Sequence, residues 1–93
     1  MNDDAIDERR VCWHSRRGML ELDLVLMPFA EQVYPGLDNA DKLRYRTLLE
    51  CEDADLFSWI VHREPVSAPE LVYIIGLVLD HGRPRIEYSN QGV

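Results

Sequence analysis

The sequence predicts an all-α protein, a single compact five-helix bundle-like domain. Apolar residues recur at helical spacing in five successive segments. No run of alternating polar and apolar residues is bounded by hairpin turns, so strands are not expected. A chain of 93 residues is long enough for one such domain and too short for two. We assign residues 1–82 to the domain and residues 83–93, which are polar, to a flexible tail.

The first helix is predicted over about residues 3–16, with an aspartate at its start as the cap. Ile6 and Trp13 lie two turns apart on one face and are expected to anchor the helix to the core. Basic Arg16 falls in the last turn, where it suits the negative end of the helix dipole. Gly18 is expected to end the segment in a left-handed conformation, which glycine adopts without steric cost.

The second helix is predicted over about residues 19–33. Its apolar stripe follows the helical repeat and comprises Met19, Leu22, Val25, Leu26, Phe29 and Val33. Pro28 lies inside this pattern, so we expect a kink there rather than a new element. The segment "YPGLDNAD" then forms a turn.

Asp38 is the predicted cap of a third helix that runs to about residue 51, with Asp41 completing a capping box. The residues expected to face inward are Ala40, Leu43, Thr47, Leu48 and Cys51. Tyr45 and Tyr73 are expected to reach solvent with their hydroxyl groups.

Asp53 is the predicted N-cap of a short fourth helix. The buried residues of that helix are expected to be Leu56, Phe57, Ile60 and Val61. Ser67 and Glu70 form a second capping box at the start of a central fifth helix over about residues 68–80. Gly76 lies inside that helix, where it is expected to permit a close helix crossing.

Composition narrows the class of function. Ten basic and seventeen acidic residues give a net charge of −7, and no basic stripe is present. This charge disfavours nucleic-acid binding and favours a protein partner. The first ten residues lack the pattern of a secretory signal, and no apolar run is long enough to span a bilayer. We therefore expect a cytoplasmic protein without direct membrane insertion, and a monomer, because no apolar stripe is left over.

The residues that carry chemistry in other proteins are scattered here. The three histidines His14, His62 and His81 lie far apart in the sequence, and Cys12 and Cys51 form neither a metal-binding pair nor a disulfide framework. The serines sit in no nucleophile motif, and the glycines form no phosphate-binding loop. We predict a non-catalytic protein with no metal and no tightly bound cofactor, whose function is to bind another macromolecule.

The segment "RRGMLELD" is the strongest candidate for a binding surface. The structural interpretation is that Arg17 and Gly18 end one helix while Glu21 and Asp23 suit the positive start of the next. Sequence physics alone favours this interpretation. However, no side-chain cap precedes the second helix, which weakens the view that the corner serves stability only.

Two motifs, "RRGMLELDLVLMPF" (16–29) and "LLECEDADLFSWI" (48–60), closely resemble the FAD assembly factor family of succinate dehydrogenase. The resemblance covers about residues 10–80. It implies a five-helix protein that binds the flavoprotein subunit of succinate dehydrogenase, and of the related fumarate reductase. There it promotes covalent attachment of FAD to a histidine of that subunit, so the cofactor belongs to the partner.

The resemblance also implies which residues contact the partner. The family's Arg-Gly-x-x-Glu motif maps onto Arg17, Gly18 and Glu21, with Asp23 beside it; Arg10 and Arg16 extend the surface. The second motif is interpreted as mainly structural. On this basis, alanine at Arg17 or Glu21 is expected to leave melting nearly unchanged while it reduces covalent flavin in the partner.

Two alternatives remain open from the sequence. One is an antitoxin-like or regulatory acidic helical protein that binds a small basic partner, as the net charge of −7 suggests. The other is direct carriage of flavin by this chain, which predicts a coloured purified protein.

Overall fold

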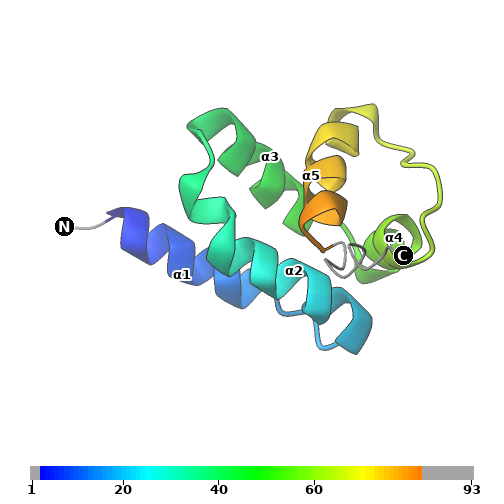
Figure 1. Ribbon diagram of the computed structural model, residues 1–93, viewed down its shortest axis with the longest axis horizontal. Coiled ribbons are helices and arrows are strands. Elements are labelled where there is room, and N and C mark those ends of the chain that lie inside the picture. The colour runs from blue at the N-terminus through cyan, green and yellow to red at the C-terminus, as the bar shows by residue number, and fades with distance from the viewer. Residues whose placement is uncertain (1–2, 83–93) are drawn as a thin grey trace, which may run out of the picture.

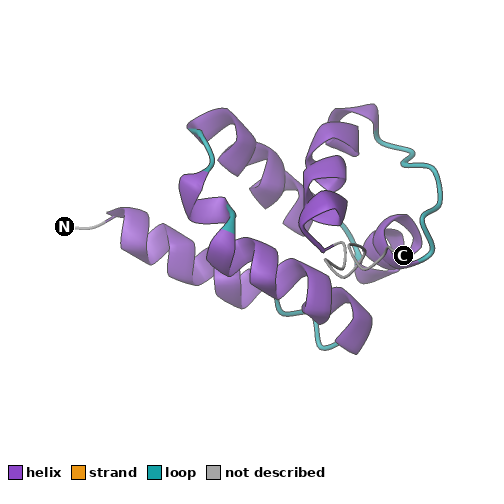
Figure 2. Ribbon diagram, viewed as in Figure 1, coloured by secondary structure: helices purple, strands orange, loops and turns teal. Residues whose placement is uncertain are grey.

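The computed structural model describes residues 3–82, and all regular structure in this range is helical (Figure 2). The five α-helices are α1 (Asp3–Ser15), α2 (Leu20–Gln32), α3 (Asn39–Leu49), α4 (Asp53–Leu56) and α5 (Val72–Gly82). Single 3₁₀ turns at Tyr34–Gly36 and Pro69–Leu71 precede α3 and α5, and a π-helical segment, Phe57–Val61, continues α4. The predicted all-α class with five helices is confirmed. The predicted tail, 83–93, lies outside the described residues.

Helices α1 and α2 lie side by side with opposite directions, and Figure 1 shows them along one side of the molecule. Helix α2 also packs on α5 and on the π-helical segment, while α3 packs on α5 and α1. Helix α2 therefore connects the α1 side of the molecule to the rest. None of the helices in residues 3–82 has the length and apolar character that a bilayer crossing requires.

The core is formed by one face of each long helix together with residues of the short helical segments between them. Its buried apolar residues are Val11, Leu22, Leu26, Phe29, Ala30, Tyr34, Tyr45, Leu48, Leu49, Leu56, Trp59, Ile60, Leu71, Ile74, Ile75 and Val78. The predicted stripe of α2 is confirmed: Leu22, Leu26 and Phe29 are fully buried, and Met19, Val25 and Val33 pack at the edge of the core. The helix continues through Pro28 without a new element.

The predicted anchor of α1 is wrong. Ile6 is 49% exposed and Trp13 is 75% exposed, whereas Val11 and Ser15 are buried. Val11 and Ser15 are four residues apart and define the inward face. Trp13 lies two residues from each, which on a helix points it away from that face. The apolar pattern does not predict this face because one of its two buried residues, Ser15, is polar.

Ser15 is buried because it belongs to a hydrogen-bonded cluster with Tyr45 of α3. The two hydroxyl oxygens lie 2.8 Å apart. Ser15 Oγ is also 2.8 Å from the Val11 carbonyl oxygen, and Tyr45 Oη is 3.3 Å from that of Leu26. Two hydroxyl protons are thus shared among three contacts that join α1, α2 and α3. The prediction that Tyr45 reaches solvent is wrong because these polar partners lie inside; Tyr73, 56% exposed, does reach solvent.

A second polar cluster fixes the turn before α3. Tyr34 Oη donates to Asp7 at 2.7 Å and accepts from Arg46 at 2.8 Å, and its ring packs on Tyr45 with centroids 5.6 Å apart. Burial, the largest cause, and the hydrogen bond to Asp7 raise the pKa of Tyr34 to about 12. The phenol therefore stays protonated and neutral at physiological pH.

The cap of α3 is confirmed, but its buried face is not. The Asp38 carboxylate accepts from the Asp41 N–H at 2.9 Å. The side chains that α3 buries are Tyr45, Leu48 and Leu49; Ala40, Leu43 and Thr47 are exposed, and Cys51 is half-buried beyond the helix end. The stripe is rotated because Tyr45, with its ring buried, takes the place that smaller apolar residues were expected to fill.

Three predictions for the later helices are also wrong. Asp53 is the first residue of α4 rather than its cap, which is Glu52 and makes no side-chain hydrogen bond. Ala68, not Ser67, precedes the helical turn at Pro69, again without a side-chain cap. A Cβ built on Gly76 meets nothing within 4 Å, so this glycine faces open space instead of a helix crossing. Leu56 and Ile60 are buried as predicted, while Phe57 and Val61 are half-buried.

Candidate functional site: the corner between α1 and α2

The corner is a short turn held by a carboxylate from the following helix. Gly18 has φ +82°, the left-handed conformation predicted for it. The Asp23 carboxylate accepts from the backbone N–H of Arg17 at 2.7 Å and from that of Gly18 at 3.2 Å. Met19, the N-cap of α2, supplies no side-chain hydrogen bond. Asp23, in the first turn of α2, therefore accepts the hydrogen bonds of two backbone N–H groups in the turn and stabilises the shape of the corner.

The Arg17 side chain leaves the corner and binds the junction between α3 and α4. Its Nη2 donates to the carbonyl oxygens of Leu49 and Cys51. Its Nε lies 3.3 Å from an Asp53 carboxylate oxygen, in ion-pair contact, although Nε is not aligned for a hydrogen bond. The side chain is only 11% exposed. Arg17 thus ties the first sequence motif to the second.

This geometry corrects one expectation from the sequence. The interpretation of Arg17 as a displayed side chain, whose loss leaves melting unchanged, does not fit a guanidinium bound to two backbone carbonyls and a carboxylate. A hydrogen bond to a charged group contributes about 1.5–3 kcal/mol. Sequence reasoning also missed Asp53 as the partner of Arg17, because nothing in a sequence shows which distant charges meet.

The remaining residues of the predicted site are at the surface. Glu21, Gly18, Arg16 and Arg10 are exposed. The side chains of Glu21, Arg16 and Arg10 make no hydrogen bond or ion pair within residues 3–82. The corner therefore separates into an inner pair, Arg17 and Asp23, which fixes its shape, and an outer set, which that shape presents to solvent.

The described residues contain no arrangement that suggests catalysis. Across residues 3–82 no group of three or more His, Cys, Asp or Glu side chains is placed to hold a metal ion. Cys12 and Cys51 are free thiols, and burial raises the pKa of both, so neither is activated as a thiolate. The exposed side chains of the corner, Arg16 and Glu21, are instead open to solvent.

Gly18 and Gly76 both face open space but differ in backbone conformation, so together they provide a test of the corner. Gly18→Ala is expected to destabilise the fold by about 1–2 kcal/mol, because alanine is strained at positive φ even in open space. Gly76→Ala, in the open face of α5, is expected to stabilise it by up to about 1 kcal/mol. Urea denaturation of both variants measures the difference. Equal stability of Gly18→Ala and wild type would contradict the left-handed conformation.

Comparison with known proteins follows the same two motifs. A family described as "Flavinator of succinate dehydrogenase" matches residues 9–81. The chain belongs to this family. The match spans both motifs and runs from the middle of α1 to the last turn of α5.

Three curated relatives of this chain carry the same name. The FAD assembly factor SdhE of Pseudomonas aeruginosa is 48% identical over 81 residues, which cover 87% of this chain and 96% of the relative. Proteins of the same name from Pseudomonas savastanoi and Shewanella oneidensis are 45% and 44% identical, over 88% and 81% of this chain and 98% and 92% of theirs. Membership in a family of assembly factors confirms the non-catalytic interpretation and the resemblance seen in the two motifs.

The family's second motif has a structural role. Leu56, Trp59 and Ile60 of "DADLFSWI" are buried in the core, as expected for this segment. Its Asp53 is the carboxylate that meets Arg17. The second motif therefore supports the corner through its contacts with Arg17.

Proposed function

We propose that this protein binds the flavoprotein subunit of succinate dehydrogenase in the cytoplasm and promotes covalent attachment of FAD to it. The observation that carries the proposal is the corner: a rigid turn, fixed by Arg17 and Asp23, that presents Gly18 and Glu21 in a family of flavinylation assembly factors. The relatives are named for FAD assembly. The flavoprotein of fumarate reductase is a second client of the same chemistry.

The mechanism needs no catalytic group from this chain. The attachment reaction uses the electrophilicity of the flavin once the partner's histidine faces the ring. A factor that binds this competent conformation more tightly than the others increases its population and therefore the rate. Glu21 makes a polar contact with the partner, and Gly18, without a side chain, permits close backbone approach. FAD stays with the partner, and this chain acts as a monomer without a tightly bound cofactor.

The test is the flavin content of the partner in cells that lack this protein. In-gel fluorescence of the denatured succinate dehydrogenase flavoprotein subunit is expected to fall to a small fraction of its normal intensity, and a plasmid copy of the chain should restore it. The fumarate reductase subunit is measured in the same gel. Normal fluorescence of both subunits in the deletion strain would refute the proposal.

A further inference from the structure

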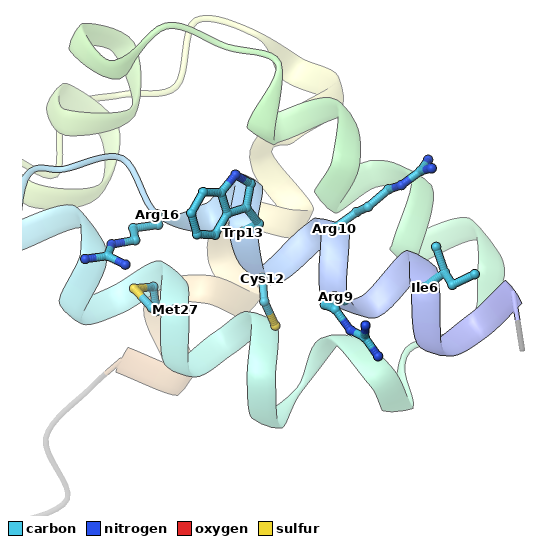
Figure 3. A pocket seen from close by; sticks show the side chains of 7 residues that line it. All are labelled: Ile6, Arg9, Arg10, Cys12, Trp13, Arg16 and Met27. Carbon is cyan, nitrogen blue, oxygen red and sulfur yellow. The ribbon is translucent and has the colours of Figure 1, made fainter.

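A groove lies on the outer side of α1, and three of its apolar side chains, Ile6, Trp13 and Met27, do not contribute to the core. It has a volume of about 520 Å³ and is lined by Ile6, Arg9, Arg10, Cys12, Trp13, Arg16 and Met27. Figure 3 shows these side chains around α1, with Met27 contributed by α2. Trp13, 75% exposed, and Ile6, 49% exposed, give it an apolar surface that residues 3–82 leave uncovered. Exposed patches of this kind mark interaction sites.

The arginines around the groove differ from the other arginines of residues 3–82 in having no partner among the described residues. Among the arginines of residues 3–82, four have partners within the fold: Arg17 with Asp53, Arg44 with Asp41, Arg46 with Asp7, and Arg63 with the Ile60 carbonyl. The other three are Arg9, Arg10 and Arg16, and their side chains have no hydrogen bond or ion pair with described residues. All three line the groove.

This distribution indicates the chemistry of the occupant. In a chain of net charge −7, three unpaired guanidinium groups surround one exposed indole. An acidic segment with an apolar side chain complements both features, because its carboxylates meet the arginines while its apolar group covers Trp13. Trp and Arg are also the residues most often found at the energetic centres of protein interfaces.

The groove is continuous with the corner. Arg16 follows α1 directly and lines the groove, and it stands two residues before Gly18. Along α2, Leu20 and Leu24 are 68% and 64% exposed, and with Met27 they follow the helical repeat on one face. This face leads from the corner to the groove. The corner alone is also small compared with the roughly 800 Å² that each partner contributes to a stable interface.

We propose that the α1 groove binds an acidic segment of the same flavoprotein subunit, with Trp13 as the apolar anchor and Arg9, Arg10 and Arg16 as the charge contacts. This proposal rests on the proposed function. It extends the contact area from Arg10 and Arg16, which already belong to the outer set of the corner, to Trp13 and Arg9 on α1. A longer contact area fixes the orientation of a partner, which one small corner does not.

The test measures binding of the purified chain to the purified flavoprotein subunit lacking covalent flavin. Trp13→Ala is expected to raise Kd on the order of 30-fold, as for an interface hot spot. Arg9, Arg10 and Arg16 replaced together by glutamine should raise Kd and reduce its dependence on salt concentration. Leu43→Ala and Arg44→Gln on α3, an exposed leucine and an exposed arginine away from the groove, are matched controls that should bind like wild type.

Acrylamide quenching of tryptophan fluorescence identifies the occupant. Trp59 is only 7% exposed, so within this chain the accessible signal comes from Trp13, and the same mixture with Trp13→Phe gives the background from the partner. Protection of Trp13 by the flavoprotein subunit, lost in the triple arginine variant, is the expected result. Protection by free FAD alone, or by raising the concentration of this chain alone, would assign the groove to a different occupant and overturn the proposal.

The outcomes also separate this proposal from the proposed function. If Glu21→Ala weakens binding while Trp13→Ala and the triple arginine variant bind like wild type, the groove assignment is wrong and the function stands. If the wild-type chain does not bind the flavoprotein subunit at all, both are wrong. The melting temperature of each variant is measured alongside binding. Replacing an exposed side chain is expected to leave the melting temperature unchanged, so a change in Kd then reports on the interface.

Discussion

Arg17→Ala is expected to lower stability and flavinylation together. The variant loses the hydrogen bonds to the Leu49 and Cys51 carbonyl oxygens and leaves the Asp53 carboxylate without its ion-pair partner. We expect the free energy of unfolding to fall by about 1.5–3 kcal/mol, since a hydrogen bond to a charged group contributes that much. In a domain of this size that loss corresponds to a fall in Tm on the order of 10 °C. Differential scanning fluorimetry measures it.

The control for this prediction is Arg44→Ala. Arg44 is an exposed arginine that pairs with Asp41 on the surface of the same helix and lies over the exposed ring of Tyr73. Exposed pairs of this kind contribute about 0–1 kcal/mol. Arg17→Lys is also informative, because a lysine keeps the charge but lacks the planar fork that reaches two carbonyls and a carboxylate. A Tm of Arg17→Ala within one degree of wild type would contradict the structural role assigned to Arg17.

Glu21→Ala is expected to show the opposite pattern, with an unchanged fold and impaired function. Glu21 is exposed, and its side chain binds nothing within residues 3–82. Its removal costs only the favourable charge at the start of α2, a few tenths of a kcal/mol. If Glu21 contacts the partner, a lost charged contact reduces the flavinylation rate by roughly tenfold or more.

The readout is covalent flavin formed on the flavoprotein subunit in a purified reaction, followed by in-gel fluorescence with time. Glu31→Ala is the matched control, because Glu31 is an exposed glutamate of the same helix, ten residues further along. Full activity of Glu21→Ala at wild-type stability would remove Glu21 from the partner surface. Arg17→Ala and Glu21→Ala thus distinguish residues that shape the corner from residues that use it.

The sequence was sufficient for features that depend on local geometry. The left-handed conformation of Gly18, the Asp38 cap and the apolar stripe of α2 follow from residues a few positions apart, and all three are confirmed. The family resemblance was also local, since it rested on two continuous motifs, and residues 9–81 match the family.

The features that failed depend on contacts between distant residues. Ser15 and Tyr45 look like surface residues until each is placed beside the other, 30 positions away in the chain. The same holds for Arg17 and Asp53. From the sequence, Arg17 is expected to point to solvent, but in the structure its guanidinium is largely buried against Asp53. The wrong prediction that Trp13 is buried has the same origin, since the buried face of α1 contains Ser15 and not Trp13.

The contacts of Arg17 have a consequence for how this protein can change over time. Two of its three partners are main-chain carbonyl groups, at Leu49 and Cys51, which any amino acid provides. Substitutions at these positions are therefore limited by core packing and not by the hydrogen bonds to Arg17. Asp53 is the one partner that binds through its side chain, so the link to Arg17 restricts the residue type at position 53 and not at the two positions that supply carbonyl acceptors.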